Sequence, residues 1–196
     1  MITKYKLNKY SNNLETILNG ANNNSIDFGL NWYNDFYLWS ENLGKKYNYD
    51  TFTIASVFSA LSPRNKLEKN KIDTINVLEA IKQGLKPEQI KVSTFNNNKN
   101  KAFNIALNKD SIKKDSLKTY SFCQNVGNLN SNFVTIDVWQ MRALTLKKEY
   151  KTPTKLEYLQ LVELHQKLAN KYNILGYQLQ AITWETLRNN YKTILK

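Results

Sequence analysis

The stretch TFTIASVFSAL, residues 51–61, is apolar on almost every side, and this limits the folds that the chain can adopt. A helix with apolar residues all round is stable only when other elements bury it. Asp50 is suited to cap its first turn, and the residue before Pro63 avoids helical angles. We therefore expect a central, buried helix that ends at the turn SPRN, residues 62–65.

The remaining pattern also favours helices. Trp32, Phe36, Trp39 and Leu43 recur at spacings of three and four residues, which is typical of one apolar helix face. No linker is long enough to separate independent domains, so residues 1–196 are predicted to form one all-α domain of about nine helices. The other expected helices are 11–20, 66–81, 96–107, 116–127, 135–146, 153–172 and 177–192, with a single turn at 84–90.

The charge balance is strongly basic, with 28 Lys and Arg against 16 Asp and Glu, a net charge of +12 and a pI of about 9.6. A polyanion such as nucleic acid is one explanation. Biased coding DNA is the other, because Lys, Asn, Ile and Tyr are all abundant and only three residues are arginine. Either origin leaves a surface that attracts phosphate groups without reading sequence.

The rare residue types exclude several kinds of site. One cysteine cannot form an internal disulfide or hold an iron–sulfur cluster, and one cysteine with one histidine argues against a zinc site. Magnesium bound by carboxylates is not excluded, but we expect no cofactor and no metal. Neither a secretory signal nor an apolar run near the ~20 residues of a membrane span is present. We therefore expect a cytoplasmic protein without a membrane partner.

The stretch VTIDVWQMR, residues 134–142, places the carboxylate of Asp137 between two apolar residues where a helix begins. The free N–H groups and the dipole of a helix start favour an ionised aspartate by ~0.3–1 kcal/mol. Asp137 is therefore either an ordinary helix cap or a charged group kept at the mouth of a cleft.

Three short motifs follow one another along the chain: Ser59, Ala60 and Asn70, then Lys101, Ala102 and Ile105, then Ile136, Asp137 and Arg142. Their order resembles that of the helix-hairpin-helix (HhH-GPD) DNA glycosylase superfamily. The sequence is also similar to small phage-encoded proteins that end in a motif matched here by Gln180, Ile182, Trp184 and Arg188. The superfamily's glycine-containing hairpin turn is missing, because residues 113–120 hold no glycine.

The resemblance implies two lobes, one from residues ~62–127 and one from the N- and C-terminal segments. It also implies a monomer that binds duplex DNA with a flipped base, in the host cytoplasm if the protein is phage-encoded. Asp137 would stabilise the sugar cation or activate water, and Lys118 is the nearest match to the lysine of the lyase members. The candidates for substrate binding are Ser62, Arg64, Asn65, Asn70, Trp139 and Gln180, and those for DNA binding are Lys99, Lys101 and Arg142.

Three functions agree with these observations. The first is a DNA base-processing enzyme, either an N-glycosylase or a relative that modifies the flipped base. The second is a DNA-binding or phage counter-defence protein that uses the same cleft without chemistry. The third is a protein that binds a nucleotide or another small anion.

Overall fold

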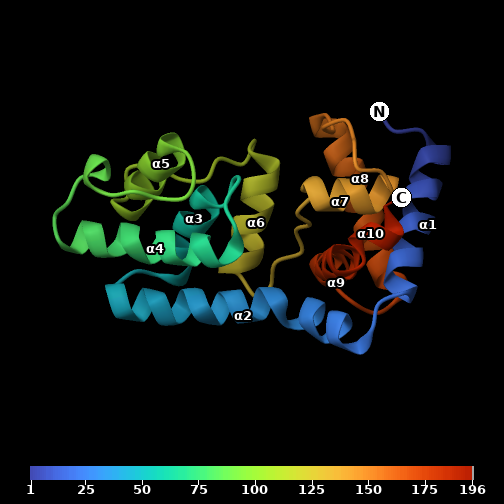
Figure 1. Cartoon of the computed structure of the whole chain (residues 1–196), viewed down its shortest axis with the longest axis horizontal. Helices are drawn as coiled ribbons and strands as arrows, with labels where there is room; N and C mark the ends of the chain where they lie inside the picture. The colour runs from blue at the N-terminus through green and yellow to red at the C-terminus, as the bar shows by residue number, and fades with distance from the viewer. Residues whose placement is uncertain (196) are drawn as a thin grey trace. The chain divides into compact units, whose positions relative to one another are not determined.

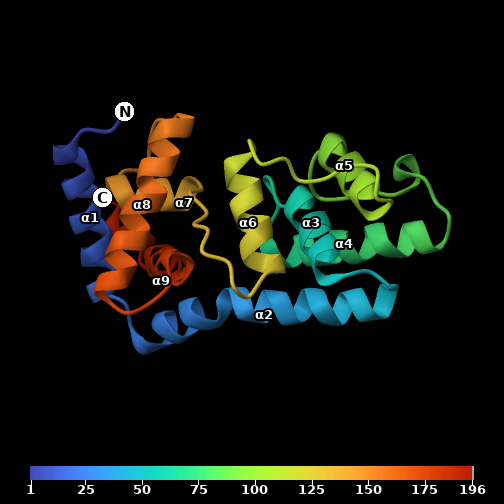
Figure 2. The same cartoon turned by 180° about the vertical axis from the view of Figure 1, so that it is seen from behind.

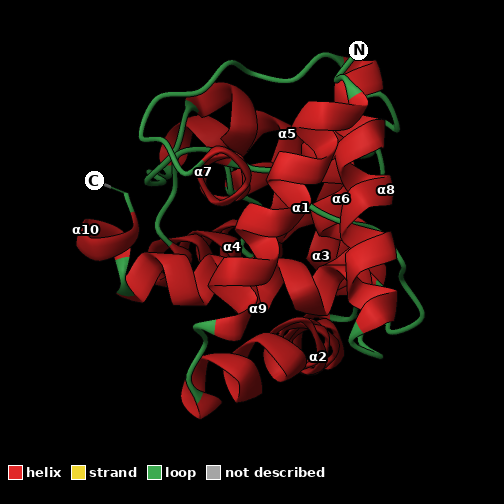
Figure 3. Cartoon of the chain, turned by 90° about the vertical axis from the view of Figure 1, so that its right-hand side faces the viewer, coloured by secondary structure: helices red, strands yellow, loops and turns green. Residues whose placement is uncertain are grey.

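A computed structural model describes residues 1–195, and this part of the chain consists of helices and loops without a strand (Figure 3). It contains ten α-helices and one 3₁₀ turn, η1, and only α10 is shorter than two turns. The prediction of an all-α fold with about nine helices is confirmed. The helices are α1 Lys4–Asn19, α2 Asn23–Tyr47, α3 Thr51–Leu61, α4 Leu67–Lys82, α5 Asn96–Ala106, α6 Leu117–Gly127, α7 Val138–Thr145, α8 Lys155–Lys171, α9 Gly176–Asn189 and α10 Tyr191–Ile194, with η1 at Pro87–Gln89.

Two N-terminal helices are longer than predicted. The predicted cap of the first helix, Ser11, lies inside α1, which starts at Lys4 and is capped by the Thr3 side chain. The Asn-rich segment before Trp32 is the first turn of α2, where the Asn22 side chain accepts a hydrogen bond from the Ser25 N–H at 2.8 Å. Asn and Ser are weak helix formers but good caps, so sequence patterning read these turns as loops.

The chain divides into two compact units. Unit 1 is Met1–Asp35 together with the chain from Asn130 onward, and unit 2 is Phe36–Leu129. Helix α2 contributes its first half to unit 1 and its second half to unit 2. The predicted middle lobe, residues ~62–127, lies within unit 2, which also takes in α3 and the second half of α2.

In unit 2, helix α3 is central and packs against α4, α5 and α6 (Figure 1 and Figure 2). The Asp50 carboxylate accepts from the Thr53 N–H at 2.8 Å and caps α3 as predicted. Every residue from Ile54 to Leu61 is buried, and Phe58 is fully buried among Phe36, Trp39 and Phe122. The all-round apolar pattern therefore did identify the centre of this core.

In unit 1, helices α1, α7, α8 and α9 pack on one another (Figure 3). The first half of α2 joins them at Gly29, which lies directly against Ile182 of α9. No helix within residues 1–195 is long and apolar enough to cross a lipid bilayer.

Replacing Gly29 by alanine is expected to lower the free energy of unfolding by about 2–3 kcal/mol, because overpacking forces backbone shifts. A Cβ at position 29 would lie 2.5 Å from the Ile182 backbone nitrogen. Gly20→Ala is the matched control, since its Cβ would meet no atom closer than 3.4 Å. Urea denaturation measures both variants. An equal, small change in the two would show that α2 and α9 do not pack closely at Gly29.

Candidate functional site around Asp137

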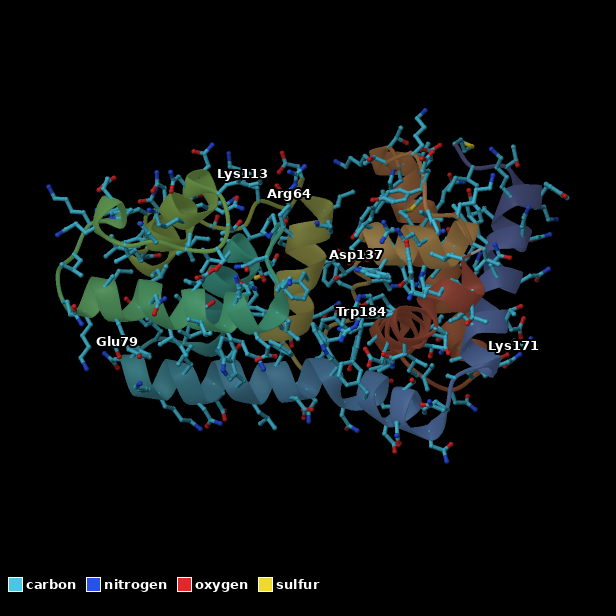
Figure 4. The ribbon with its side chains drawn as sticks, viewed as in Figure 1. Arg64, Glu79, Lys113, Asp137, Lys171 and Trp184 are labelled. Carbon is cyan, nitrogen blue, oxygen red and sulfur yellow. The ribbon has the colours of Figure 1, made fainter. Side chains whose placement is uncertain are left out.

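Asp137 is the N-cap of α7 (Figure 4). Its Oδ1 accepts a hydrogen bond from the Gln140 N–H at 2.9 Å, and its side chain is half-buried. The helix was predicted to begin near Thr135, but residues 134–136 form no regular secondary structure and α7 starts at Val138. Asp137 itself has extended backbone angles, so its carboxylate lies directly on the helix N-terminus.

The segment before Asp137, residues 134–136, is buried and held by side chains of other helices. Val134 is fully buried and Ile136 is 4% exposed. The Tyr158 hydroxyl of α8 accepts from the Ile136 N–H and donates to the Val134 carbonyl, both at 3.1 Å. The Tyr33 hydroxyl of α2 lies 3.4 Å from the Thr135 Oγ1. The two Tyr158 bonds satisfy backbone groups that this buried segment would otherwise leave unpaired.

A buried polar network supports the first turn of α7 from the other side. The Gln140 Nε2 lies 2.6 Å from the Nε2 of His165 on α8 and 3.1 Å from the Oγ1 of Thr183 on α9. The His165 Nδ1 lies 2.7 Å from the Leu161 carbonyl, so the Nδ1–H donates and the Nε2 accepts from Gln140. Burial lowers the pKa of His165 to about 4, which keeps the ring neutral.

Three more predicted residues lie in unit 1. Gln180 is buried, and its Oε1 accepts from the Tyr33 hydroxyl at 2.9 Å. Trp139 is half-buried and meets the Tyr191 ring edge to face. The Arg142 guanidinium lies over both rings, 5.0 Å from Trp139 and 5.6 Å from Tyr191. Trp139 and Arg142 thus form one aromatic–cation cluster on α7.

The SPRN turn lies in unit 2 and is tied to the segment before α5. The Ser62 hydroxyl donates to the Ser59 carbonyl, which ends α3. Arg64 is exposed in a left-handed conformation, φ 56°, with its guanidinium 5.5 Å from the Phe95 ring centroid. The Thr94 hydroxyl donates to the Pro63 carbonyl at 2.7 Å. Arg64 is the exposed residue of this turn, and the other three are half-buried.

Asn65 and Asn70 make structural hydrogen bonds inside unit 2. The Asn65 amide donates to the Asp73 carboxylate at 2.8 Å, and the same carboxylate oxygen accepts from the Ser93 N–H. The Asn70 amide donates to the Phe58 carbonyl at 3.1 Å, and the Asn70 side chain is 2% exposed. Sequence reasoning missed Asp73, which is 3% exposed and links the SPRN turn to residue 93.

The three predicted lysines differ in exposure. Lys99 is 6% exposed, and its ammonium donates to the Ile90 carbonyl at 2.8 Å, so its charge serves the fold of unit 2. Lys101 is half-buried on α5 and Lys118 is exposed in the first turn of α6. We therefore keep Lys101 as a candidate DNA contact and no longer include Lys99.

No group of three His, Cys, Asp or Glu side chains within residues 1–195 is arranged to hold a metal ion. A groove of about 430 Å³ runs between α1 and α8, where Lys171 (Figure 4) forms an ion pair with Glu15. None of the predicted site residues lines this groove.

Comparison with known proteins gives one family. The model of a family of unknown function, DUF7178, matches residues 1–191. The chain belongs to the DUF7178 family. No curated protein and no solved structure matches the chain. The resemblance to the glycosylase superfamily accordingly rests on the sequence motifs, and membership of DUF7178 assigns no activity.

Proposed function

We propose that this DUF7178 protein is a DNA base-processing enzyme that acts at the N-glycosidic bond of a flipped, modified base. The observation that carries the proposal is the placement of Asp137. Its carboxylate caps α7, remains half-buried rather than sealed in the core, and follows a buried segment that is hydrogen-bonded to Tyr158 and Tyr33.

The chemistry requires a fixed negative charge beside the sugar. When the C1′–N bond breaks, its electron pair leaves with the base and positive charge develops on the sugar. A carboxylate near C1′ stabilises that charge. Water then forms the new C1′–O bond and passes a proton to the carboxylate, which acts as general base. In this proposal Asp137 has both roles, and exposed Lys118 is not needed for base release.

The helix N-terminus suits such a carboxylate. The free N–H groups at the start of α7 place partial positive charge beside Asp137, which favours its ionised form. The Gln140 N–H bond also favours the charged form, because it donates to the carboxylate. Both effects offset the cost of keeping the charged Asp137 carboxylate half-buried. An extruded base bound beside it would bury the carboxylate further.

The charge of both units favours DNA as the partner. Residues 36–129 contain fifteen Lys and Arg against eight Asp and Glu, and the rest of the chain contains thirteen against eight. Arg64, stacked on exposed Phe95, and half-buried Arg142 are the arginines among the proposed contacts. Neutralised phosphates release counterions, which makes such binding dependent on salt.

We expect the protein to bind duplex DNA and to lose at least about 100-fold in affinity between 50 and 200 mM salt, which corresponds to roughly four or five neutralised phosphates. Fluorescence anisotropy of a labelled duplex measures this slope. An affinity that does not change with salt, or no binding at 50 mM, would remove DNA as the partner and with it both DNA-directed functions.

Base release is tested on duplexes that each carry one damaged or hypermodified base. Abasic sites are detected by strand cleavage in hot alkali, and altered bases by a mobility shift of the released nucleoside. Product from at least one duplex supports the proposal. Salt-dependent binding without product on any duplex would instead support a non-catalytic DNA-binding or counter-defence protein.

A further inference from the structure

We infer that Tyr158 and the Gln140–His165 pair are positioning residues that hold the Asp137 carboxylate in place. The inference rests on the proposed function, because a carboxylate acting on a sugar has to be held within ~0.5 Å of its productive position. The Gln140 N–H bond ties Oδ1 to α7, so the position of that oxygen depends on what holds α7 and the segment before it.

Two sets of hydrogen bonds, which we call brackets, hold the chain on either side of Asp137. The first bracket lies upstream of Asp137. The Tyr158 hydroxyl joins the Ile136 N–H to the Val134 carbonyl and thereby fixes the peptide that precedes Asp137. Tyr158 itself is 6% exposed, so its ring is held by packing as well. A side chain that is held in this way fixes the position and the direction of the backbone where it enters α7.

The second bracket lies downstream. The two amide hydrogens of Gln140 have the acceptors His165 and Thr183, at 2.6 and 3.1 Å. The His165 ring offers a lone pair at Nε2 only because its Nδ1–H donates to the Leu161 carbonyl. One orientation of the Gln140 amide therefore satisfies both neighbours. This orientation holds Gln140 in place, and its backbone N–H binds Asp137.

The Gln140 Oε1 has no hydrogen-bond partner among the described residues, although the side chain is fully buried. An unpaired buried oxygen costs stability, on the order of 1–3 kcal/mol. An apolar side chain would avoid this cost, so the arrangement favours a fixed orientation over maximal stability.

Helix α8 contributes a residue to both brackets. Tyr158 and His165 are seven residues apart, close to two helical turns, and share one face of α8. The same helix thus fixes the residue before Asp137 and the residue three positions after it. Loss of either contact is expected to move the carboxylate while leaving the rest of unit 1 folded.

The test uses Tyr158→Phe and Gln140→Met, which keep side-chain volume and remove the hydrogen bonds. Tyr172→Phe and Gln160→Met are the matched controls, because these residues bind Glu15 and Ile2 rather than the Asp137 segment. Amide hydrogen exchange at position 140 reports on the Asp137 bond, and exchange elsewhere in α8 and α9 reports on the fold. Turnover and DNA affinity are measured on the best duplex from the base-release panel.

We expect exchange at position 140 to become at least about tenfold faster in both test variants and to change less than about twofold in the controls. Turnover is expected to fall about 10- to 100-fold with unchanged DNA affinity, since a misplacement near 1 Å has costs of this size. A general structural role would instead speed exchange throughout unit 1 and weaken DNA binding.

Wild-type protection at position 140 in both test variants would overturn the inference. If either variant does not fold, Thr183→Val removes a single acceptor of Gln140 and is expected to show the same local change at smaller size. If the wild type forms no product, the proposed function fails, while the exchange data still decide whether these residues hold Asp137.

Discussion

Asp137→Asn is expected to lower product formation by about 100- to 10,000-fold, the range that general acid–base groups contribute. The amide cannot carry the negative charge or accept the proton of water. Asparagine is as good an N-cap as aspartate, so its Oδ1 keeps the bond to the Gln140 N–H. Stability and DNA affinity should therefore stay close to those of the wild type.

Asp50→Asn is the control for this variant. Asp50 is the N-cap of α3 and makes the same kind of bond, to the Thr53 N–H at 2.8 Å, within unit 2. It removes the same charge from an equivalent helix start, so its product formation should match the wild type. If both variants lose activity equally, or neither does, the charge at Asp137 has no special role.

Acidification from pH 6.5 to pH 4 is expected to remove about 3 kcal/mol of stability through His165 alone. Burial lowers the pKa of folded His165 to about 4, whereas an unfolded histidine takes up its proton near the ordinary value of about 6.5. Between these values the unfolded state binds more protons, so stability falls as the pH falls. Above about pH 7.5 the histidine is neutral in both states and the effect disappears.

His165→Gln isolates this contribution, because glutamine has a comparable length and does not titrate. Urea denaturation at several pH values between 4 and 7 gives the two stability curves. The wild-type curve should fall more steeply than that of the variant, and the carboxyl groups that the proteins share cancel in the difference. Parallel curves would mean that His165 is accessible to protons in the folded state.

Local patterns in the sequence predicted the helices and the centre of unit 2 well. The stretch from Thr51 to Leu61 follows a capping residue, Asp50, precedes the turn SPRN and is apolar on almost every side. Helix α3 has the bounds that these features predicted. The start of α7 was placed about three residues early. Thr135 and Ile136 were read as the first turn, but they lie outside the helix, and Tyr158, 22 residues away from Ile136, holds their segment.

The surroundings of Asp137 were not predictable in the same way. Gln140 reads as one polar residue of a short helix, and His165 as a histidine among leucines. Their contact joins residues 25 positions apart, and the Gln140–Thr183 bond joins residues 43 apart. Such pairs depend on how α7, α8 and α9 pack on one another. The spacing of residues within one helix does not predict this packing.

Buried polar residues of unit 2 show the same limit. Lys99 was taken for a surface lysine because most lysines are exposed, but its ammonium reaches the Ile90 carbonyl. The sequence around Asp73 predicted only a polar helix and no structural role for this residue. Its carboxylate nevertheless links Asn65 and the Ser93 N–H. Motif order pointed to Asp137 and to the SPRN turn, whereas hydrogen-bond partners required the tertiary structure.

Mass spectrometry of free bases and nucleosides, after incubation with DNA from the protein's native context, tests the central claim most directly. The account predicts that the wild type releases a base in amounts equal to the abasic sites formed, or yields an altered nucleoside, and that Asp137→Asn does neither. DNA that is bound by the wild type but recovered with every base intact would contradict a catalytic role for Asp137.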